Sequence, residues 1–344
     1  MKISIGLGAY GHSDFKEVIE FVQLAERLGV DSVWSAEAWG RDAVTSLAYL
    51  AALTDRIALG TGIMQISARV PSMTAMTALS LNAISGGRFR LGLGVSGPQV
   101  VEGLQGQDYS RPLTRLKETV AICRKAFAGE KLEFQGKAFT LPRPGGEGKS
   151  IRLEHAPADI PIYLATLGPK SLEYTGEAAD GWLGTSFSPD HPEAHLDYIR
   201  KGAAPAGRGL EAIEICAAVA VTLGDDVDAI VAARKPNVAF QMGAMGSART
   251  NFYNEAFQRA GYAEDAKAIQ ALWKQGERAA AAARVPDAMV TEFQAVGTPD
   301  MVRERFKKYR AVGVDVLNVR LDGAGGHKAR LETLEAAAEI ARGI

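Results

Sequence analysis

Residues 57–93 read IALGTGIMQISARVPSMTAMTALSLNAISGGRFRLGL, a stretch with the order strand, helix, strand. The segments Ile57–Gly60 and Phe89–Leu93 are short and almost wholly apolar, as expected of strands that are buried on both faces of a parallel sheet. Between them, Ser72–Ile84 has the apolar spacing of a helix. The stretch therefore predicts one βαβ unit, which takes roughly 30 residues from strand to strand.

The same rhythm continues in both directions along the chain. Eight strands are predicted: Lys2–Leu7, Asp31–Ser35, Ile57–Gly60, Phe89–Leu93, Ile162–Leu164, Gly181–Gly184, Ile213–Leu223 and Val314–Val319. Residues 131–141 interrupt the rhythm with a small hairpin around Gln135–Gly136, and residues 227–290 are predicted to be mostly helical. We therefore expect an α/β protein, a (β/α)8 TIM barrel with a helical insertion (227–290) after strand 7, and one domain over residues 1–344.

A doubly wound open sheet is the main alternative fold. Its dinucleotide-binding form carries the pattern GxGxxG after the first strand, and Gly6, Gly8 and Gly11 have this spacing. The acidic residue that should follow about 20 positions later falls inside the first predicted helix. The strand count favours the barrel.

The composition excludes several classes of protein. The formal charge is -1, from 39 basic and 40 acidic residues, and a nucleic-acid binder would show a basic excess. The chain has no apolar run of about 18 residues, and its N-terminus lacks the pattern of a signal peptide. The two cysteines and five histidines have no metal-ligand spacing. We expect a cytoplasmic protein without metal, membrane or nucleic-acid partners.

In a TIM barrel, functional groups gather at the carboxyl ends of the strands. The fourth turn, Gly92–Pro98, has glycines that let backbone amides approach a ligand, and Ser96 adds a hydroxyl. In the fifth turn, Pro169 suits the first position of a helix whose open amides, with Thr166 and Lys170, form a cradle for phosphate. A tight turn and a capped helix with a solvated lysine are the structural alternatives.

No self-sufficient catalytic apparatus is apparent in the sequence. There is no GxSxG elbow and no carboxylate pair with glycosidase spacing. This pattern indicates that a cofactor supplies the chemistry while the protein orients the reactants and excludes water.

Several ordered motifs resemble the bacterial luciferase-like superfamily over nearly the whole chain. They are GVDSVW at residues 29–34, LGTGI at 59–63, GGRFRLGLG at 86–94, GEAADGW at 176–182 and VGTPD at 296–300. One branch of this superfamily binds flavin mononucleotide (FMN) and inserts oxygen. The other binds coenzyme F420 and transfers hydride. Gly97–Gly103 and the segment from Met245 to Tyr253 resemble the F420 branch, which includes the methylene-tetrahydromethanopterin reductases and their actinobacterial relatives.

The resemblance implies a set of cofactor-binding residues. It places a non-proline cis peptide bond at Gly62–Ile63, behind the deazaflavin ring, and it assigns the cofactor's phosphate to Ser96 and Gly97 with residues of the fifth turn. The full set is Thr61, Gly62, Ile63, Val95, Ser96, Gly97, Thr166, Gly168, Pro169 and Lys170. Alcohol and sugar-phosphate dehydrogenases of the family have a histidine after the second strand, where this chain has Ala38. The departure argues for reduction of a small organic acceptor rather than for oxidation of an alcohol.

The proton for such a reduction has three candidate donors in the chain, Glu37, Glu102 and Tyr10, besides water. For Glu37, a role at a helix start or in an ion pair with Arg41 is the alternative. An FMN-dependent monooxygenase and a non-catalytic, ligand-binding barrel are the other functions to consider. The resemblance favours a homodimer, and Gly243–Tyr253 is expected either to reach over the barrel mouth or to pack on its flank.

Overall fold

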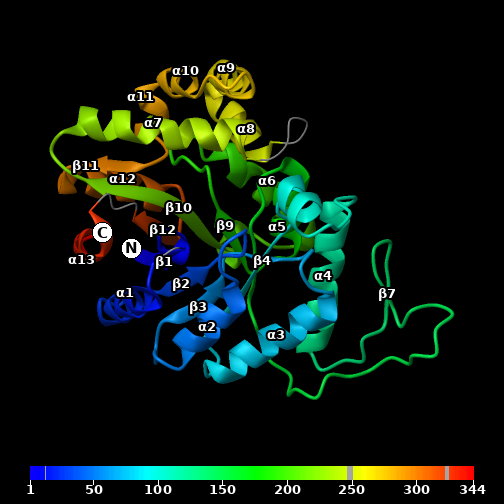
Figure 1. Ribbon diagram of the computed structural model, residues 1–344. Coiled ribbons are helices and arrows are strands. Elements are labelled where there is room, and N and C mark those ends of the chain that lie inside the picture. The colour runs from blue at the N-terminus through cyan, green and yellow to red at the C-terminus, as the bar shows by residue number, and fades with distance from the viewer. Residues whose placement is uncertain (12, 246–250, 322–324) are drawn as a thin grey trace. The chain divides into compact units, whose positions relative to one another are not determined.

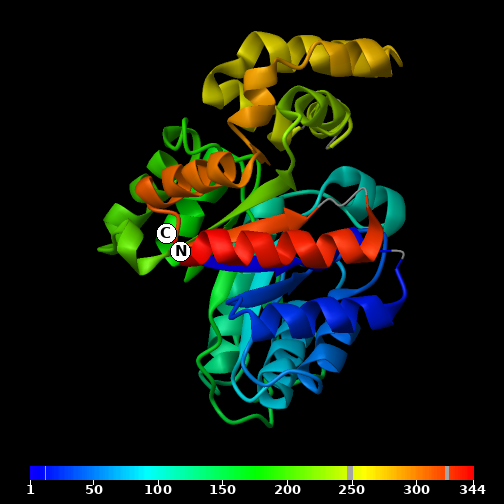
Figure 2. The same ribbon diagram turned by 90° about the vertical axis from the view of Figure 1, so that its left-hand side faces the viewer.

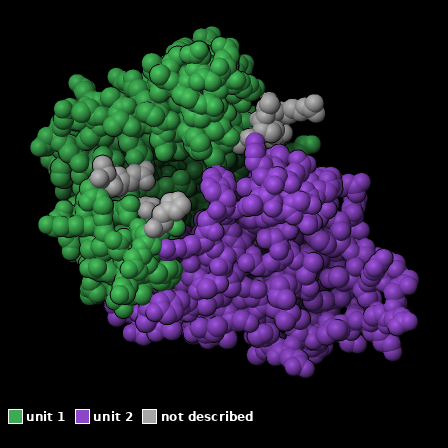
Figure 3. All heavy atoms as spheres, in the orientation of Figure 1, with its two compact units in different colours: residues 1–32, 166–344 green, residues 33–165 purple. Residues whose placement is uncertain are grey.

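The computed structural model describes residues 1–11, 13–245, 251–321 and 325–344. The chain divides into two compact units, unit 1 with residues 1–32 and 166–344 and unit 2 with residues 33–165 (Figure 3). Each unit contains parallel strands that alternate with helices along the chain (Figure 1).

Unit 2 carries four parallel strands in the order β2-β3-β5-β8. Their bounds are β2 Ser32–Ser35, β3 Ala58–Thr61, β5 Phe89–Gly94 and β8 Ile162–Leu164, and the two-residue strand β4, Met64–Gln65, pairs with β5. Its helices are α2 Ala43–Ala51, α3 Pro71–Ile84, the π-helix η2 Gln99–Leu104 and α4 Pro112–Phe127. The predicted hairpin is present as β6, Phe134–Gln135, paired antiparallel with β7, Thr140–Leu141.

Unit 1 carries four parallel strands in the order β9-β10-β12-β1. Their bounds are β1 Lys2–Gly6, β9 Gly181–Gly184, β10 Glu214–Leu223 and β12 Val316–Leu321, and the short strand β11, Ala295–Gly297, pairs with the end of β10. The helices between the strands are η1 Leu7–Tyr10, α1 Phe15–Arg27, α5 Pro169–Ala178, α6 Glu193–Ala203, η3 Ala204–Ala206, η4 Leu210–Ala212, α12 Pro299–Ala311 and α13 Gly326–Arg342.

Between β10 and β11 the chain forms a group of helices instead of a single one. These are α7 Val227–Gly243, α8 Phe252–Phe257, the π-helix η5 Gln258–Tyr262, α9 Ala263–Lys274, α10 Arg278–Ala283 and α11 Asp287–Thr291. Figures 1 and 2 show them gathered at one end of unit 1. They share an apolar core that includes Met242, Phe257 and Ile269.

The eight main strands form a closed parallel (β/α)8 barrel, the TIM-barrel fold. The prediction from the repeated βαβ rhythm is confirmed, and the open-sheet alternative is wrong. The reason is the strand pairing: the strand order runs β10-β12-β1-β2-β3-β5-β8-β9, and β9 pairs again with β10, so the sheet has no open edge among these eight strands. The short strands β4 and β11 were not predicted.

Candidate functional site

Two side chains of unit 2, the aromatic Trp34 and the aliphatic Ile63, pack closely on the backbone near the carboxyl ends of β3 and β5. The Gly62–Ile63 peptide bond is cis, as the resemblance implied. A Cβ atom at Gly60 would lie 2.3 Å from the ring of Trp34, and one at Gly94 would lie 2.9 Å from the Ile63 side chain. Glycine is therefore required at both positions, because it lets Trp34 and Ile63 lie directly on the backbone of the strands.

The hydroxyl of Thr61 is bound within the barrel. It donates to the Gly92 carbonyl oxygen at 2.8 Å, its oxygen accepts from the Gly92 amide at 2.9 Å, and the residue is fully buried. Thr61 therefore joins β3 to β5, and a contact with a ligand through this hydroxyl is not indicated.

The turn after β5 is partly accessible. Val95, Ser96 and Gly97 are all half-buried, and Ser96 has a left-handed backbone with φ 57°. The Tyr109 hydroxyl donates to the Ser96 carbonyl oxygen at 3.3 Å. A serine held in this unfavourable region is a feature that concentrates at ligand-binding sites.

Glu37 is a buried partner of Arg69. Arg69 Nη1 donates to Glu37 Oε2 at 2.8 Å and Nη2 donates to Oε1 at 2.7 Å. The same carboxylate accepts from the backbone amides of Ala43, at the start of α2, and of Gln65. The helix-start and ion-pair alternative is thus the one that the geometry supports, with Arg69 as the cation. A carboxylate surrounded by four donors is poorly placed to hand a proton to a substrate.

Glu102 lies on the exposed side of η2. Its negative charge acts on the Tyr109 hydroxyl. Burial raises the pKa of Tyr109, and the Glu102 charge raises it further, to a smaller extent. Glu102 is accessible to solvent and, unlike Glu37, is not tied to an arginine in the described part of the chain.

In unit 1, the turn after β8 leads into α5. Thr166 is buried, its hydroxyl lies 2.7 Å from the Thr175 hydroxyl, and its carbonyl oxygen accepts from Trp182 Nε1 at 3.0 Å. Gly168 is the residue before α5 and gives no side-chain cap, Pro169 is the first helical residue, and Lys170 is exposed. The helix start without a side-chain cap and the exposed Lys170 have the free amides and positive charge that suit an anion. The Thr166 hydroxyl, in contrast, is hydrogen-bonded to the Thr175 hydroxyl.

Tyr10 is buried between α1 and α13. Its hydroxyl lies 3.2 Å from His327 Nδ1, its ring packs on Phe21, and the Arg330 guanidinium lies 4.7 Å from the ring centre. Burial raises the pKa of Tyr10 to about 12, partly opposed by the Arg330 charge. The hydroxyl is held by its helix neighbours, so a catalytic role for Tyr10 is not indicated.

The helical group of unit 1 reaches the turn after β8. Phe252, the first residue of α8, would lie 3.5 Å from a Cβ atom at Gly168, and Arg259 Nη2 donates to the Leu167 carbonyl oxygen at 2.7 Å. Of the segment Gly243–Tyr253, residues 246–250 lie outside the described residues, so its place over the mouth stays a prediction. Those contacts place α8 and η5 beside a strand-end turn.

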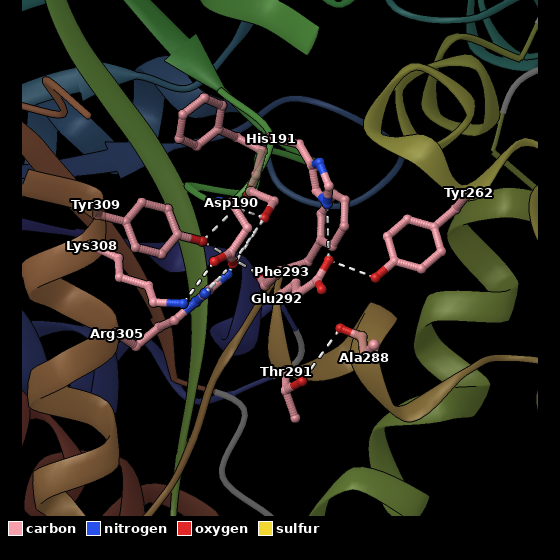
Figure 4. A network of polar contacts seen from close by, with 12 residues as sticks. Asp190, His191, Tyr262, Ala288, Thr291, Glu292, Phe293, Arg305, Lys308 and Tyr309 are labelled. Atoms are coloured by element: carbon pink, nitrogen blue, oxygen red, sulfur yellow. Dashed lines mark hydrogen bonds and ion pairs between the residues drawn. The ribbon is translucent and has the colours of Figure 1, made fainter. Parts of the chain in front are cut away.

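A polar network holds the same helical group to the loop after β9 (Figure 4). Glu292 accepts from the Tyr262 hydroxyl at 2.5 Å and lies 3.2 Å from His191 Nε2. Next to it, Asp190 pairs with Arg305 and with Lys308. Burial alone would raise the pKa of Asp190, but hydrogen bonds from the two cations hold this pKa below its usual value.

Sequence reasoning did not identify Arg69, Tyr109 and Arg259. Arg69 lies eight residues beyond the end of β3, and its partner Glu37 follows a different strand. Their spacing carries no local pattern, because the pair forms only when β2 and β3 lie side by side.

The matches to known proteins agree with this geometry. The family model described as luciferase-like monooxygenase matches residues 2–316. The chain belongs to the luciferase-like monooxygenase family. Relatives in this comparison are named as an oxidoreductase and as reductases, so the chain is an enzyme and the non-catalytic barrel is not supported.

Two relatives and one solved structure show what the chain is similar to within this family. A Mycobacterium tuberculosis protein provisionally named a coenzyme F420-dependent oxidoreductase is 40% identical over 94% of this chain and 96% of that protein. The 5,10-methylenetetrahydromethanopterin reductase of Methanolobus tindarius is 32% identical over 87% of this chain and 88% of its own length. The structure of the coenzyme F420-dependent tetrahydromethanopterin reductase from Methanopyrus kandleri has the same fold. Its TM-score is 0.80 at 24% identity, and the match covers 98% of this chain and 97% of that one.

Across residues 1–11, 13–245, 251–321 and 325–344, no helix has the length and apolar character needed to cross a membrane. The same ranges hold no cluster of three or more metal-ligating side chains.

Proposed function

We propose that this protein is an F420-dependent oxidoreductase that transfers hydride between the deazaflavin C5 and a small organic acceptor. The observation that carries the proposal is the 40% identity to the Mycobacterium tuberculosis protein over 94% of the chain. Identity at that level over nearly the whole of both chains supports a shared fold, in which ligands bind at the carboxyl ends of the strands.

The residues of the two units fit such a cofactor. In unit 2, Val95, Ser96 and Gly97 remain partly exposed at the end of β5, and Ile63 lies flat on Gly94. In unit 1, the uncapped start of α5 and the exposed Lys170 suit a phosphate group. Gly62, Gly168 and Pro169 contribute through the backbone shape of these turns. When bound, the deazaflavin supplies a two-electron hydride donor or acceptor.

The protein's own part is to bind, to orient and to exclude water. The aliphatic side chain of Ile63 offers an apolar backing to a flat ring. Because Glu37 is bound to Arg69 and the Tyr10 hydroxyl is bound to His327, Glu102 and water are the proton sources we favour.

We propose the reductase direction for the net reaction. Ala38 is exposed after β2 and has no group that can accept a proton from an alcohol. An activated C=C or C=N acceptor needs no such base. Turnover of alcohols or glucose 6-phosphate with oxidised F420 would contradict this direction.

The test of the cofactor is a titration of the purified protein with F420 and, separately, with FMN, followed by tryptophan fluorescence. We expect selective binding of F420, after which a panel of acceptors can be assayed with reduced F420. Preferential binding of FMN and oxygen consumption with a flavin reductase would assign the chain to the oxygen-using branch instead.

We further propose that the protein is a homodimer through α2 and α3. These adjacent helices contain no charged residue in either segment, and they expose Tyr49, Met73, Met76 and Ile84. An uncharged, apolar face of this kind on two neighbouring helices is typical of a protein–protein interface. A second copy of the chain is the occupant that the family resemblance favours.

A further inference from the structure

Two successive carbonyl groups in the turn after β8 are held by side chains of unit 1. The Thr166 carbonyl oxygen accepts from Trp182 Nε1 at 3.0 Å, and the Leu167 carbonyl oxygen accepts from Arg259 Nη2 at 2.7 Å. Trp182 belongs to β9 and Arg259 belongs to η5, so partners from two other elements fix one short turn. The turn leads directly into α5 through Gly168.

The bond from Arg259 also fixes the direction of the Gly168 amide. A peptide unit is planar and trans, so the N–H of one residue points away from the C=O of the residue before it. A guanidinium bound to the Leu167 carbonyl oxygen therefore directs the Gly168 amide away from Arg259. Among the residues that the structure describes, this amide has no acceptor, and Gly168 is half-buried. It is an oriented donor at the start of a ten-residue helix.

Arg259 joins η5 to two other segments of unit 1. Besides the bond to Leu167, its Nε donates to the Ala194 carbonyl oxygen at 3.1 Å, at the start of α6, and its guanidinium lies 5.9 Å from the centre of the Tyr198 ring. Within the described ranges Arg259 forms no ion pair, so its positive charge stays beside the Leu167–Gly168 peptide. Arginine suits this place because its planar fork presents several donors in fixed directions.

The helix before η5 packs on the same turn. The ring of Phe252, the first residue of α8, lies 3.5 Å from the position that a Cβ atom at Gly168 would take. The start of α8 is itself fixed, because the Asn251 side chain accepts from the Asn254 amide at 3.0 Å and donates to the Met242 carbonyl oxygen at 2.8 Å. The helical group between β10 and β11 therefore supports the turn through Arg259 and through Phe252.

We propose that Arg259 is a positioning residue for the phosphate of the cofactor and acts on it through the Leu167–Gly168 peptide. The inference rests on the proposed function, in which this phosphate binds at the start of α5. A donor whose direction is fixed before the ligand arrives loses less conformational freedom on binding, so the bound state is favoured. F420 contains the phosphate, whereas FO, the deazaflavin without the phosphate-bearing tail, does not. The effect of Arg259 therefore falls on F420 and spares FO.

The experiment compares the wild-type chain with Arg259→Met, Arg259→Lys and Arg234→Met. Arg234→Met is the matched control, since Arg234 Nε binds the Gln294 side chain at 2.7 Å and so joins the same helical group to a different segment. Each protein is titrated with F420 and, separately, with FO, followed by fluorescence. Thermal melting shows whether each variant is folded.

We expect Arg259→Met to weaken F420 about tenfold and to leave the affinity for FO within about twofold of the wild type. Arg259→Lys keeps the charge but replaces the fork by one ammonium, so F420 should weaken by about threefold. Arg234→Met should bind both probes as the wild type does, even where its melting temperature falls. An unchanged affinity of Arg259→Met for F420, or an equal loss of F420 and FO in the Arg259 variants, would overturn the proposal.

Hydrogen exchange of the ligand-free proteins separates this inference from the cofactor assignment. The Ser171 and Leu172 amides donate to the Gly168 carbonyl oxygen at 3.1 and 2.9 Å, so their exchange reports how firmly the turn is held. We expect it to be about tenfold faster in Arg259→Met than in Arg234→Met. A wild-type protein that binds neither F420 nor FO contradicts the cofactor assignment. Equal exchange in the two variants contradicts the positioning role of Arg259, whatever the ligand.

Discussion

The Glu37–Arg69 pair shows how one residue's role depends on its neighbours. A carboxylate after a barrel strand is a reasonable proton donor by position, yet here it accepts two hydrogen bonds from Arg69 and two from backbone amides. Only 7% of the Glu37 side chain and 20% of the Arg69 side chain are exposed. Removing one partner therefore leaves the other buried without compensation.

We expect Glu37→Gln and Arg69→Gln each to lower the free energy of unfolding by about 2 to 3 kcal/mol, measured by urea denaturation. The double variant should lose less than the sum, because the two changes remove one interaction. The exposed Lys125–Glu130 pair is the control, with a change within about 0.5 kcal/mol. A Glu37→Gln variant of normal stability that no longer reduces acceptors would restore Glu37 as the proton donor.

His195 gives the protein a pH-dependent stability. It is almost fully buried beside Trp182 and Phe187, both ring nitrogens lack partners among the described residues, and burial lowers its pKa to about 3. The unfolded chain takes up a proton below pH 6.5, while the folded chain does not until about pH 3. The stability that the protein has with His195 neutral is therefore fully present above pH 6.5, and it is lost progressively as the pH falls towards 3.

Between about pH 6 and pH 4, we expect the free energy of unfolding of the wild-type protein to fall more steeply with falling pH than that of His195→Leu. The expected difference in slope is roughly 1.4 kcal/mol per pH unit. Thermal or urea unfolding of both proteins across this range measures the effect. An acid limb of equal slope in the two proteins would show that other groups carry it.

At the scale of elements, α5 and α6 of unit 1 pack with their backbones in contact. A Cβ atom at Gly176 would lie 2.0 Å from the Ile199 carbonyl oxygen, and one at Gly202 would lie 1.7 Å from the Glu173 carbonyl oxygen. Backbone atoms cannot give way as flexible side chains do. These two glycines therefore set the distance between the helices.

We expect Gly202→Ala to lower the free energy of unfolding by about 3 kcal/mol or more, because the helices must separate to admit one methyl group. Gly40→Ala is the control, since nothing lies within 4 Å of the position that its Cβ would take. Denaturant unfolding compares the two. A Gly202→Ala protein as stable as Gly40→Ala would mean that the helices shift freely.

At the scale of the whole molecule, the uncharged face of α2 and α3 is a surface that exposes apolar side chains. We expect Met76→Glu to convert the proposed homodimer to a monomer, because burying an unpaired carboxylate in an apolar interface is costly. Sedimentation velocity or light scattering measures the mass. Ile151→Glu, at an exposed apolar residue outside these helices, should leave the dimer intact. A wild-type monomer at micromolar concentration would contradict the proposed dimer.

The sequence by itself determined the class and order of the fold. The predicted strands match the eight barrel strands to within a few residues at each end, because short apolar runs alternating with helical spacing are local signals. The family motifs likewise identified the luciferase-like family and placed the cis peptide bond at Gly62–Ile63, since both depend on residues that are adjacent in the chain.

Only the tertiary structure decided which polar groups are free to act. The hydroxyls of Thr61, Thr166 and Tyr10 and the carboxylate of Glu37 all lie at or beyond strand ends, yet each is bound by a residue from another element. Such partners have no sequence signature, because a hydrogen bond between two elements depends on their packing and not on the spacing of residues within either one.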